Sequence, residues 1–277
     1  MERPAKRTRL ESKLATSLEK RRSNSTIRNL TTNAPDSVDF SSNDFISLAK
    51  SQDLHQEFLK ELHKFPSHTS LGSGGSRLLD GNSSYAEKLE KDIAAFHGGE
   101  TGLLCNSGFD ANVGLFSCLP QSGDIVLYDE YIHASVHDGM RLSRASQCVK
   151  FDHNDLESFS RMLKSSHIAG DTAVRDGNKS VFISVEAVYS MDGDIAPLRE
   201  MKRAIDEVLP EGNGYLIVDE AHSTGVLGPR GSGLVCELGM EQDVLVRLHT
   251  FGKGLACNGG SSRSSSFWYD PIADTGT

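Results

Sequence analysis

The stretch "SVFISVEAVYSMDGDIAPLREMKRAIDEVLPEGNGYLIVDEAH", residues 180–222, decides the fold. It contains two short apolar runs, 180–186 and 214–219, and between them residues 197–210 have the apolar spacing of an amphipathic helix. Apolar runs of this length on both sides of such a helix are typical of buried strands in a parallel sheet. The stretch therefore predicts a strand–helix–strand unit in which both strands end on a carboxylate.

The same alternation continues outward in both directions. Helical spacing recurs in "SSYAEKLEKDIAAFHG" (83–98) and "DLESFSRMLKSS" (155–166). Further apolar runs are "GLLC" (102–105), "DIVLYD" (124–129), "CVKF" (148–151) and "DVLVRLHTF" (243–251). This order predicts a three-layer α/β/α fold, in which helices cover both faces of a mostly parallel sheet. Ligands of such sheets gather at the carboxyl ends of the strands, and polar or glycine-rich sequence follows five of the runs there.

Composition narrows the class of protein. The 277 residues correspond to one large domain or two smaller ones, and 37% of them are hydrophobic, which allows a sizeable core. The formal net charge of −9 argues against nucleic acid as a partner. No apolar run approaches the roughly 18 residues of a membrane span. The five cysteines follow no C-x-x-C spacing, so a reducing compartment fits better than a disulfide framework or a zinc ribbon.

Residues 1–38 are predicted to form a basic N-terminal arm. Leu10, Leu14 and Leu18 recur every four residues, as on a short amphipathic helix. A solvated arm that docks on the main body is the plain interpretation of this charge run, and a mitochondrial presequence, diluted by residues such as Glu11, is the alternative. Because the segment lacks the apolar core of a secretory signal, a cytoplasmic protein is expected, with mitochondria and peroxisomes left open.

Lys253 follows the last apolar run and is flanked by Gly252 and Gly254. Glycines allow a bound group to approach the backbone closely. A lysine that is partly desolvated at a strand end has a lowered amine pKa, which enables it to form a Schiff base with a carbonyl group. An ordinary surface lysine is the alternative.

Asp219 and His222 belong to the letters "VDEAH" at the end of a predicted strand. A carboxylate there can keep the ring nitrogen of an aromatic cofactor protonated, as pyridoxal phosphate requires. The same letters occur at the metal-binding acid of ATP-driven helicases, which also need a phosphate loop of the form G-x-x-x-x-G-K-[ST]. The sequence contains no such loop, since Lys253 is followed by glycine, and the helicase interpretation is rejected.

Two glycine-containing segments are candidates for binding phosphate. In "NSGFDAN" (106–112) the backbone amides from Gly108 onward would form a cradle at a helix start, and a simple strand–helix turn is the alternative. "LGSGGSRLLDG" (71–81) departs from G-x-G-x-x-G because Arg77 stands in place of the last glycine, so a dinucleotide site is not favoured.

His133 and His137 are four residues apart, a spacing that on a helix can bind zinc. The zinc-protease motif needs glutamate where Ala134 stands, and no metal site is predicted. His133 at a strand end would instead lie flat on an aromatic cofactor ring. An ordinary packed histidine is the remaining interpretation.

Eight segments in this order resemble the α-oxoamine synthases, fold-type I enzymes that depend on pyridoxal 5'-phosphate (PLP). They are "SNDFISLA", "GSGGSRLLDGN", "NSGFDAN", "HAS", "FDHND", "VEAVYSMDGDIAPL", "VDEAHSTGVLG" and "TFGKG". The resemblance covers Asn43 to Gly260. It implies the large domain of this fold, PLP as cofactor, a homodimer, and a reaction that condenses an amino acid with an acyl-CoA thioester, with loss of carbon dioxide and CoA.

The resemblance also implies roles around the cofactor ring. Lys253 would bind PLP covalently and later move the α-proton of the substrate. Asp219 would pair with the ring nitrogen and His222 with the phenolic oxygen, while His133 would stack on the ring. The residues implied to hold the phosphate are Ser107, Gly108, Phe109 and Thr250. Those implied to line the reacting centre or contact substrate are Glu186, Ser190, Asn43, Gly74 and Ser76.

The implied substrates come from the glycine-rich motif. "GSGGSRLLDGN" resembles most the branch that condenses L-alanine with pimeloyl-CoA in biotin biosynthesis. The alternatives are the branches that act as glycine C-acetyltransferase, 5-aminolevulinate synthase or serine palmitoyltransferase, and synthases of secondary metabolism. The alternative to an enzyme is a non-catalytic remnant that binds the cofactor or a full-length partner.

Behind Gly260 the resemblance ends in "SSRSSSFWYDPIADTGT" (261–277). The family continues with another apolar strand and a small C-terminal domain, which is expected to be missing here. A run of serine and arginine is not expected to form a buried strand. The domain 39–260 is therefore predicted to have an open sheet edge, and 261–277 to be an irregular tail. A fragment, a frameshifted gene model or a retained intron would each explain the break.

Overall fold

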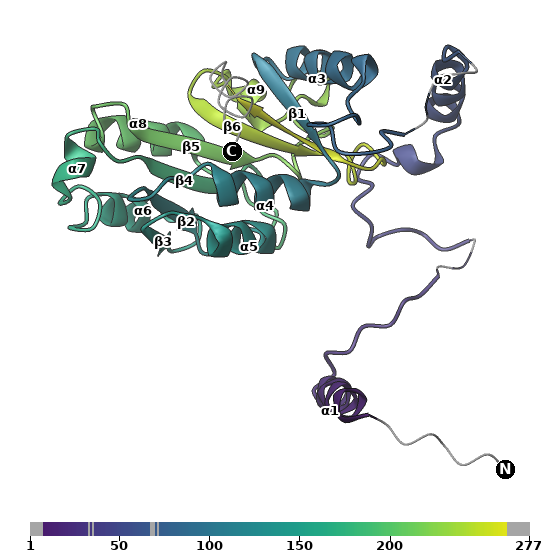
Figure 1. Cartoon of the computed structure of the whole chain (residues 1–277), viewed down its shortest axis with the longest axis horizontal. Coiled ribbons are helices and arrows are strands. Elements are labelled where there is room, and N and C mark those ends of the chain that lie inside the picture. Colours follow the sequence, from purple (N-terminus) through teal and green to yellow (C-terminus); the bar gives the residue numbers. More distant parts are fainter. Residues whose placement is uncertain (1–7, 33, 35, 67–69, 71, 265–277) are drawn as a thin grey trace. The chain divides into compact units, whose positions relative to one another are not determined.

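The computed structural model describes residues 8–32, 34, 36–66, 70 and 72–264. Two compact units divide the chain at Ser41/Ser42, and the first of them contains helix α1 (Figure 1). The helices are α1 (Arg9–Ser23), α2 (Gln52–His63), α3 (Ser84–Phe96), α4 (Gly108–Cys118), α5 (Ala134–Leu142), α6 (Leu156–Leu163), α7 (Thr172–Arg175), α8 (Leu198–Val208) and α9 (Leu234–Leu238). The strands are β1 (Thr101–Cys105), β2 (Ile125–Asp129), β3 (Gln147–Phe151), β4 (Val181–Glu186), β5 (Gly214–Asp219), β6 (Val244–Thr250) and β7 (Gly260–Ser264).

The described strands form one sheet in the order β1-β7-β6-β5-β4-β2-β3. The five neighbours from β6 to β3 are parallel, and β7 is antiparallel to both β6 and β1. Successive strand residues point to opposite faces, so Ile183 packs in one apolar cluster with helices α6 and α8, and Phe182 packs in a second cluster with α4 and α5. The predicted three-layer α/β/α fold is confirmed, and all six predicted apolar runs are strands.

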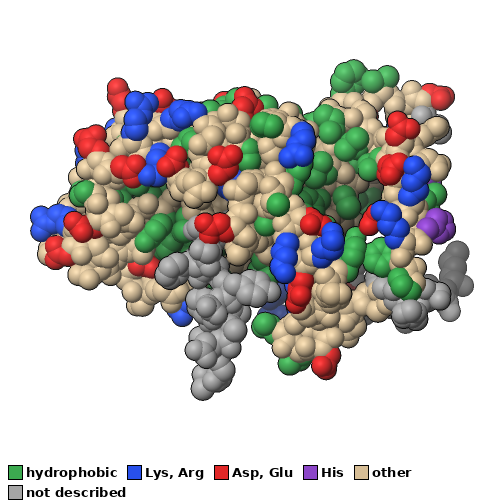
Figure 2. Space-filling model, turned by 90° about the horizontal axis from the view of Figure 1, so that it is seen from above, with side chains coloured by type: hydrophobic (Ala, Val, Ile, Leu, Met, Phe, Trp, Pro, Cys, Tyr) green, Lys and Arg blue, Asp and Glu red, His purple; other side chains and the backbone are tan. Residues whose placement is uncertain are grey.

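Charged and apolar side chains are mixed on the face of the molecule shown in Figure 2. Many of the charges form ion pairs within one helix, such as Lys202–Asp206 at 2.6 Å and Arg203–Glu200 at 2.8 Å on α8. Exposed pairs of this kind contribute at most about 1 kcal/mol each. No helix in the described ranges combines the length and the apolar character that crossing a bilayer requires.

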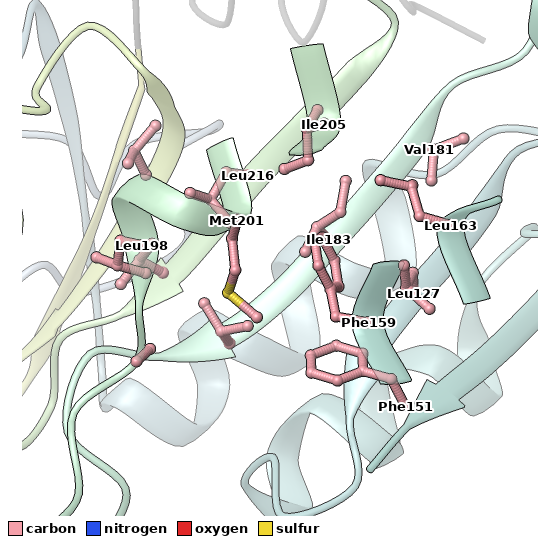
Figure 3. Close-up of a cluster of buried hydrophobic side chains, with 14 of the residues drawn as sticks. Leu127, Phe151, Phe159, Leu163, Val181, Ile183, Leu198, Met201, Ile205 and Leu216 are labelled. Atoms are coloured by element: carbon pink, nitrogen blue, oxygen red, sulfur yellow. The ribbon is translucent and has the colours of Figure 1, made fainter. Parts of the chain in front are cut away.

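The larger apolar cluster anchors the strands that lead to the site (Figure 3). Ile183 of β4 and Leu216 of β5 are at most 1% exposed. On the helices above them, Phe159 and Met201 are completely buried. Because β4 and β5 are held on both faces, the positions of their last residues, Glu186 and Asp219, are set by the core.

The serine run behind Gly260 corrects two predictions. Residues 260–264 form β7, which lies between β1 and β6 and not at an edge, so the expected open edge and the irregular structure of 261–264 were wrong. Backbone hydrogen bonds on both sides outweigh the low strand propensity of serine. Small residues are also required, because Ser261 is completely buried and a side chain at Gly260 would lie 2.8 Å from the Gly108 nitrogen. The rest of the predicted tail, 265–277, lies outside the described residues.

Gly139→Ala is expected to destabilise the protein by about 1–3 kcal/mol, because a methyl group at this position overpacks the contact between α4 and α5. The new Cβ would lie 2.8 Å from Phe116 Cβ and 3.0 Å from the Asn112 carbonyl oxygen. Gly114→Ala, on the exposed side of α4, is the matched control; nothing lies within 4 Å of its Cβ position. The control is expected to gain up to about 1 kcal/mol from helix propensity. Urea unfolding of both variants measures the difference, and equal stabilities would contradict the prediction.

Candidate active site

Lys253 and His222 meet at the carboxyl edge of the sheet. Nζ of Lys253, in the loop after β6, lies 2.8 Å from Nε2 of His222, which follows β5. Burial lowers the pKa of Lys253, and the charges of Asp219 and Glu186 oppose this effect. Burial, together with Lys253 and His133, lowers the pKa of His222 to about 4. The imidazole is therefore neutral at pH 7 and can accept a hydrogen bond from the ammonium group of Lys253.

Asp219, the last residue of β5, is held by two neutral donors. The carboxylate is 7% exposed; Oδ2 accepts a hydrogen bond from Asn112 Nδ2 at 2.8 Å, and Oδ1 accepts one from the N–H of Ala221 at 2.9 Å. Asn112 also donates to Ser135 Oγ at 3.0 Å. Neither Asn112 nor Ser135 was identified from the sequence. The available signal was the position of Asn112 one helical turn after Gly108, which turns its side chain toward the same edge of the sheet.

His133 precedes α5 and forms its N-cap. Its Nδ1 lies 2.7 Å from Ser135 Oγ and accepts the Ser135 N–H at 3.3 Å, and its ring meets Phe109 edge-on at 6.0 Å. His137 instead packs edge-on against Tyr128 at 5.3 Å. Side chains able to hold a metal ion do not form a group of three or more anywhere in the described ranges.

The start of α4 lies close to the end of β6. Ser107 is the N-cap of this 11-residue helix, and its Oγ accepts the N–H of Asp110 at 3.0 Å. A Cβ at Gly108 would lie 2.9 Å from Thr250 Cβ, so only glycine allows this close approach. Helix N-termini attract anions through their free N–H groups and partial positive charge. Phe109, in contrast, is 44% exposed.

Glu186 places a second carboxyl group in the site, at the end of β4. It is 3% exposed; Oε2 accepts the Ser190 N–H at 3.3 Å, and Oε1 has no hydrogen-bond partner. Burial, together with the charge of Asp219, raises the pKa of Glu186 to about 8, and Lys253 opposes the shift. A carboxyl group with this pKa is protonated at neutral pH and is suited to exchanging a proton with a bound ligand.

Glu186→Gln is expected to change how stability depends on pH. Glutamate titrates at 4.5 when unperturbed and at about 8 here, so between these values the folded chain binds a proton that the unfolded chain does not. The stability that this bound proton contributes is complete below pH 4.5 and is lost as the pH rises through 8. The free energy of unfolding therefore decreases over the interval. Denaturant titrations of the cofactor-free protein should show a flatter profile for the variant.

The exposed residue Glu157 of α6 provides the matched control, Glu157→Gln. Its profile is expected to follow that of the wild-type chain, because the substitution leaves Glu186 and its neighbours unchanged. Parallel profiles for the wild-type chain and Glu186→Gln would contradict the assignment of a protonated Glu186.

The residues predicted to contact substrate lie farther out. Asn43, Gly74 and Ser76 are exposed. Near Asn43 it is Phe45 that reaches the site, with its ring 5.7 Å from the ring of His222. The glycine-rich loop is fixed by its arginine, since Arg77 forms an ion pair with the buried Glu90 of α3.

The described residues thus supply a partly buried amine with an imidazole beside it and a buried carboxylate that is linked through Asn112 and Ser135 to a second imidazole. They also supply a helix N-terminus next to a threonine hydroxyl. An amine with a lowered pKa can react with a carbonyl group. A carboxylate at the end of a strand can hold a cationic nitrogen, and the helix N-terminus can hold a phosphate. The arrangement defines a site for covalent binding of an anionic carbonyl compound.

Comparison with known sequences identifies the family. The sequence model described as aminotransferase class I and II matches residues 35–268. The chain belongs to this family, in its α-oxoamine synthase branch. It is 56% identical over 232 residues to the 8-amino-7-oxononanoate synthase of Emericella nidulans, which covers 84% of this chain and 56% of the relative. It is 48% identical over 222 residues to the aminoacyl transferase sphA of Byssochlamys spectabilis, covering 80% of this chain and 47% of the relative.

Solved structures agree with this assignment. The serine palmitoyltransferase of S. paucimobilis superposes with a TM-score of 0.75 at 26% identity, covering 94% of this chain and 64% of that one, and its description includes PLP. The 8-amino-7-oxononanoate synthase of Francisella tularensis superposes with a TM-score of 0.64 at 27% identity, covering 84% and 60%. The chain spans about half the length of the curated relatives it matches.

Proposed function

We propose that this chain binds PLP covalently through Lys253 and takes part in the condensation of an amino acid with an acyl-CoA thioester. The observation that carries the proposal is the contact between Lys253 Nζ and His222 Nε2 at 2.8 Å, beside the buried carboxylate of Asp219. The groups present fit PLP, because its aldehyde, ring nitrogen and phosphate each have a counterpart in the site.

Each counterpart has a physical role. PLP, when bound, supplies an electron sink for the bonds at the substrate α-carbon. Asp219 would hold a proton at the ring nitrogen, and its two neutral donors keep it in place for this. The hydroxyl of Thr250 and the amides at the start of α4 would hold the phosphate. The amine of Lys253, whose pKa is lowered by burial, would accept the proton from the α-carbon of a bound substrate.

His222 and His133 would complete the contacts to the ring. The neutral imidazole of His222 would hydrogen-bond to the phenolic oxygen of PLP, and the His133 ring would stack on the face of the cofactor. The Ser135 hydroxyl, bound to both His133 and Asn112, links this stacking group to the partner of Asp219. His133, Ser135, Asn112 and Asp219 are therefore joined in one hydrogen-bonded set, and His222 pairs separately with Lys253.

The proposed substrates are L-alanine and pimeloyl-CoA, the pair used in biotin biosynthesis. The 56% identity to a protein named 8-amino-7-oxononanoate synthase supports this choice. Relatives named aminoacyl transferase sphA, at 48% and 49% identity, favour a second candidate, a related synthase with another amino acid or thioester.

A screen that follows CoA release tests the function and the substrates together. The purified 277-residue chain is incubated with PLP, with alanine, glycine or serine, and with acyl-CoA thioesters of increasing length. Release that is fastest with alanine and pimeloyl-CoA is the expected result, and faster release with another pair would identify the second candidate. PLP binding without release for any pair would show a cofactor-binding chain without catalysis.

The homodimer is part of the same proposal. Phe109, Tyr131 and Met191 near the site are exposed by 44%, 49% and 81%, and large apolar side chains at a surface favour protein contacts. Sedimentation velocity of the chain with and without PLP is expected to show a dimer, and a monomer at all concentrations would contradict it.

A further inference from the structure

His153, in the segment "FDHND", lies between two carboxylates outside the proposed PLP contacts. Nδ1 of His153 is 2.8 Å from Oδ1 of Asp129, the last residue of β2, and Nε2 is 3.1 Å from Oδ2 of Asp194, in the turn after β4. The side chain of Asp129 is completely buried, and that of His153 is 15% exposed. The Nδ1 contact with Asp129 is a hydrogen bond, whereas the Nε2 contact with Asp194 has an ion-pair distance without hydrogen-bond geometry. A histidine between two carboxylates favours the imidazolium ion, because the positive charge is attracted by both.

The residue that follows strengthens the same connection. Asn154 has a left-handed backbone with φ of 50°, which directs its N–H to Asp129 Oδ2 at 2.8 Å. Its side-chain amide donates to Asp194 Oδ2 at 2.6 Å and to the Ile195 carbonyl oxygen at 3.1 Å. His153 and Asn154 therefore each bind both carboxylates, so the connection is a built feature of the fold.

The two connected segments follow β2 and β4, which are neighbours in the sheet. Asp129 Oδ1 also accepts the N–H of Tyr131 at 2.8 Å, which shapes the turn that ends at His133. On the other side, the Tyr189 N–H donates to the Asp194 carbonyl oxygen at 3.0 Å, which closes the turn that contains Ser190.

The His153 ring itself is packed between these turns. It stacks on Tyr131 with 4.2 Å between ring centroids and meets Tyr189 edge-on at 4.5 Å. The His153 ring is thus the direct contact between the His133 turn and the Ser190 turn.

We propose that His153 is a positioning residue: protonated between Asp129 and Asp194, its imidazole joins the two turns, and loss of the proton loosens both. The contact between the two turns depends only on His153, Asp129 and Asp194 and not on a bound ligand. Its effect on ligand binding rests on the proposed function, since His133 and Ser190 then face PLP and substrate.

The charges around the ring set the direction of the pH effect. Burial by itself lowers the pKa of His153, but the hydrogen bond and charge of Asp129 and the charge of Asp194 outweigh it and raise the pKa above 6.5. The other charged neighbour is Glu130, which accepts the His153 backbone N–H at 3.2 Å and pairs with Lys150 at 3.3 Å. The ionic part of the joining is therefore complete at low pH and is lost as the pH rises through the raised pKa, while the two neutral hydrogen bonds of Asn154 remain.

Hydrogen exchange of the cofactor-free chain tests the joining directly. In the wild-type chain, backbone exchange in 187–196, corrected for its intrinsic pH dependence, is expected to accelerate about five- to tenfold between about pH 5 and pH 8. His153→Gln, which cannot become charged, is expected to exchange at the fast rate at both pH values. His167→Gln, at an exposed histidine, is the matched control and should behave as wild type.

A second variant separates the ionic contact from packing. Asp194→Asn keeps the shape of the side chain and removes its charge, so the NMR titration midpoint of His153 is expected to fall relative to wild type. The pH profile of PLP affinity is expected to differ between the wild-type chain and His153→Gln: Lys253 and Glu186 titrate in both, and only the wild-type chain also loses affinity through deprotonation of His153. Exchange that does not vary with pH in wild type, or that is unchanged in His153→Gln, would overturn the proposal. Failure of the wild-type chain to bind PLP at any pH would instead overturn the proposed function. The proposal for His153 would then still be tested by hydrogen exchange, which is measured without the cofactor.

Discussion

Lys253→Ala is expected to abolish covalent attachment of PLP and to reduce CoA release by about 10³-fold or more. The loss follows because the substituted chain has no other amine at the position that lies 2.8 Å from His222 Nε2. Borohydride reduction followed by intact mass and peptide mapping measures attachment, and the wild-type chain should carry one cofactor at Lys253. A cofactor retained at another lysine would contradict the assigned site.

Two controls show that the effect is chemical. Lys91→Ala, at an exposed lysine of α3, should retain attachment and CoA release. Lys253→Met should fold at least as well as wild type at neutral pH. Because burial lowers the pKa of Lys253, the charged amine costs stability at any pH below that pKa, and an apolar side chain removes the cost. A Lys253→Met chain that is unfolded at neutral pH would mean that the lysine is needed for structure.

Asp219→Asn is expected to lower CoA release by about 100-fold or more while PLP still binds. An amide cannot hold a proton at a cationic ring nitrogen, and its NH₂ group would also face Asn112 Nδ2, which now donates to Asp219 at 2.8 Å. The turnover number, measured with PLP in excess, reports the loss. Asn112→Ala removes one of the two donors and leaves the charge, so about a tenfold loss is expected.

The specificity of this effect is checked at the other end of the sheet. Asp243 is an exposed carboxylate just before β6, at the amino end of the parallel strands. Asp243→Asn is expected to leave CoA release unchanged. An Asp219→Asn chain that turns over at the wild-type rate would exclude Asp219 as the partner of the ring nitrogen.

The six apolar strands were predictable because each is a short apolar run, and the central ones, β2, β4, β5 and β6, are mostly buried on both faces. β7 left no such pattern. Its strand conformation comes from backbone groups of β1 and β6 on either side, and its composition reflects the limited space beside Gly108 and Gly102. Composition alone cannot indicate a strand whose formation depends on neighbours far away in the chain.

The residues of the candidate site also divide into those that the local sequence could indicate and those that it could not. Lys253, Asp219 and His133 could be proposed from the sequence because each stands at or shortly after the end of a predicted strand, and parallel strands bring their carboxyl ends to one edge. Asn112 and His153 could not, because they act through partners more than twenty positions away, such as Asp219 and Asp129. Such distances are determined by packing, and nothing in the local sequence records them.

The place of β7 has a consequence for how the chain acquires its structure. Thr101 pairs with Ser264, and among the described strands β1 has no other neighbour than β7. During synthesis β1 therefore leaves the ribosome long before its partner exists, with its backbone groups unpaired and open to association with other chains. Among the described strands β1 can pair only after β7 has been synthesised, and a nascent chain that stops before Gly260 would lack the partner of β1.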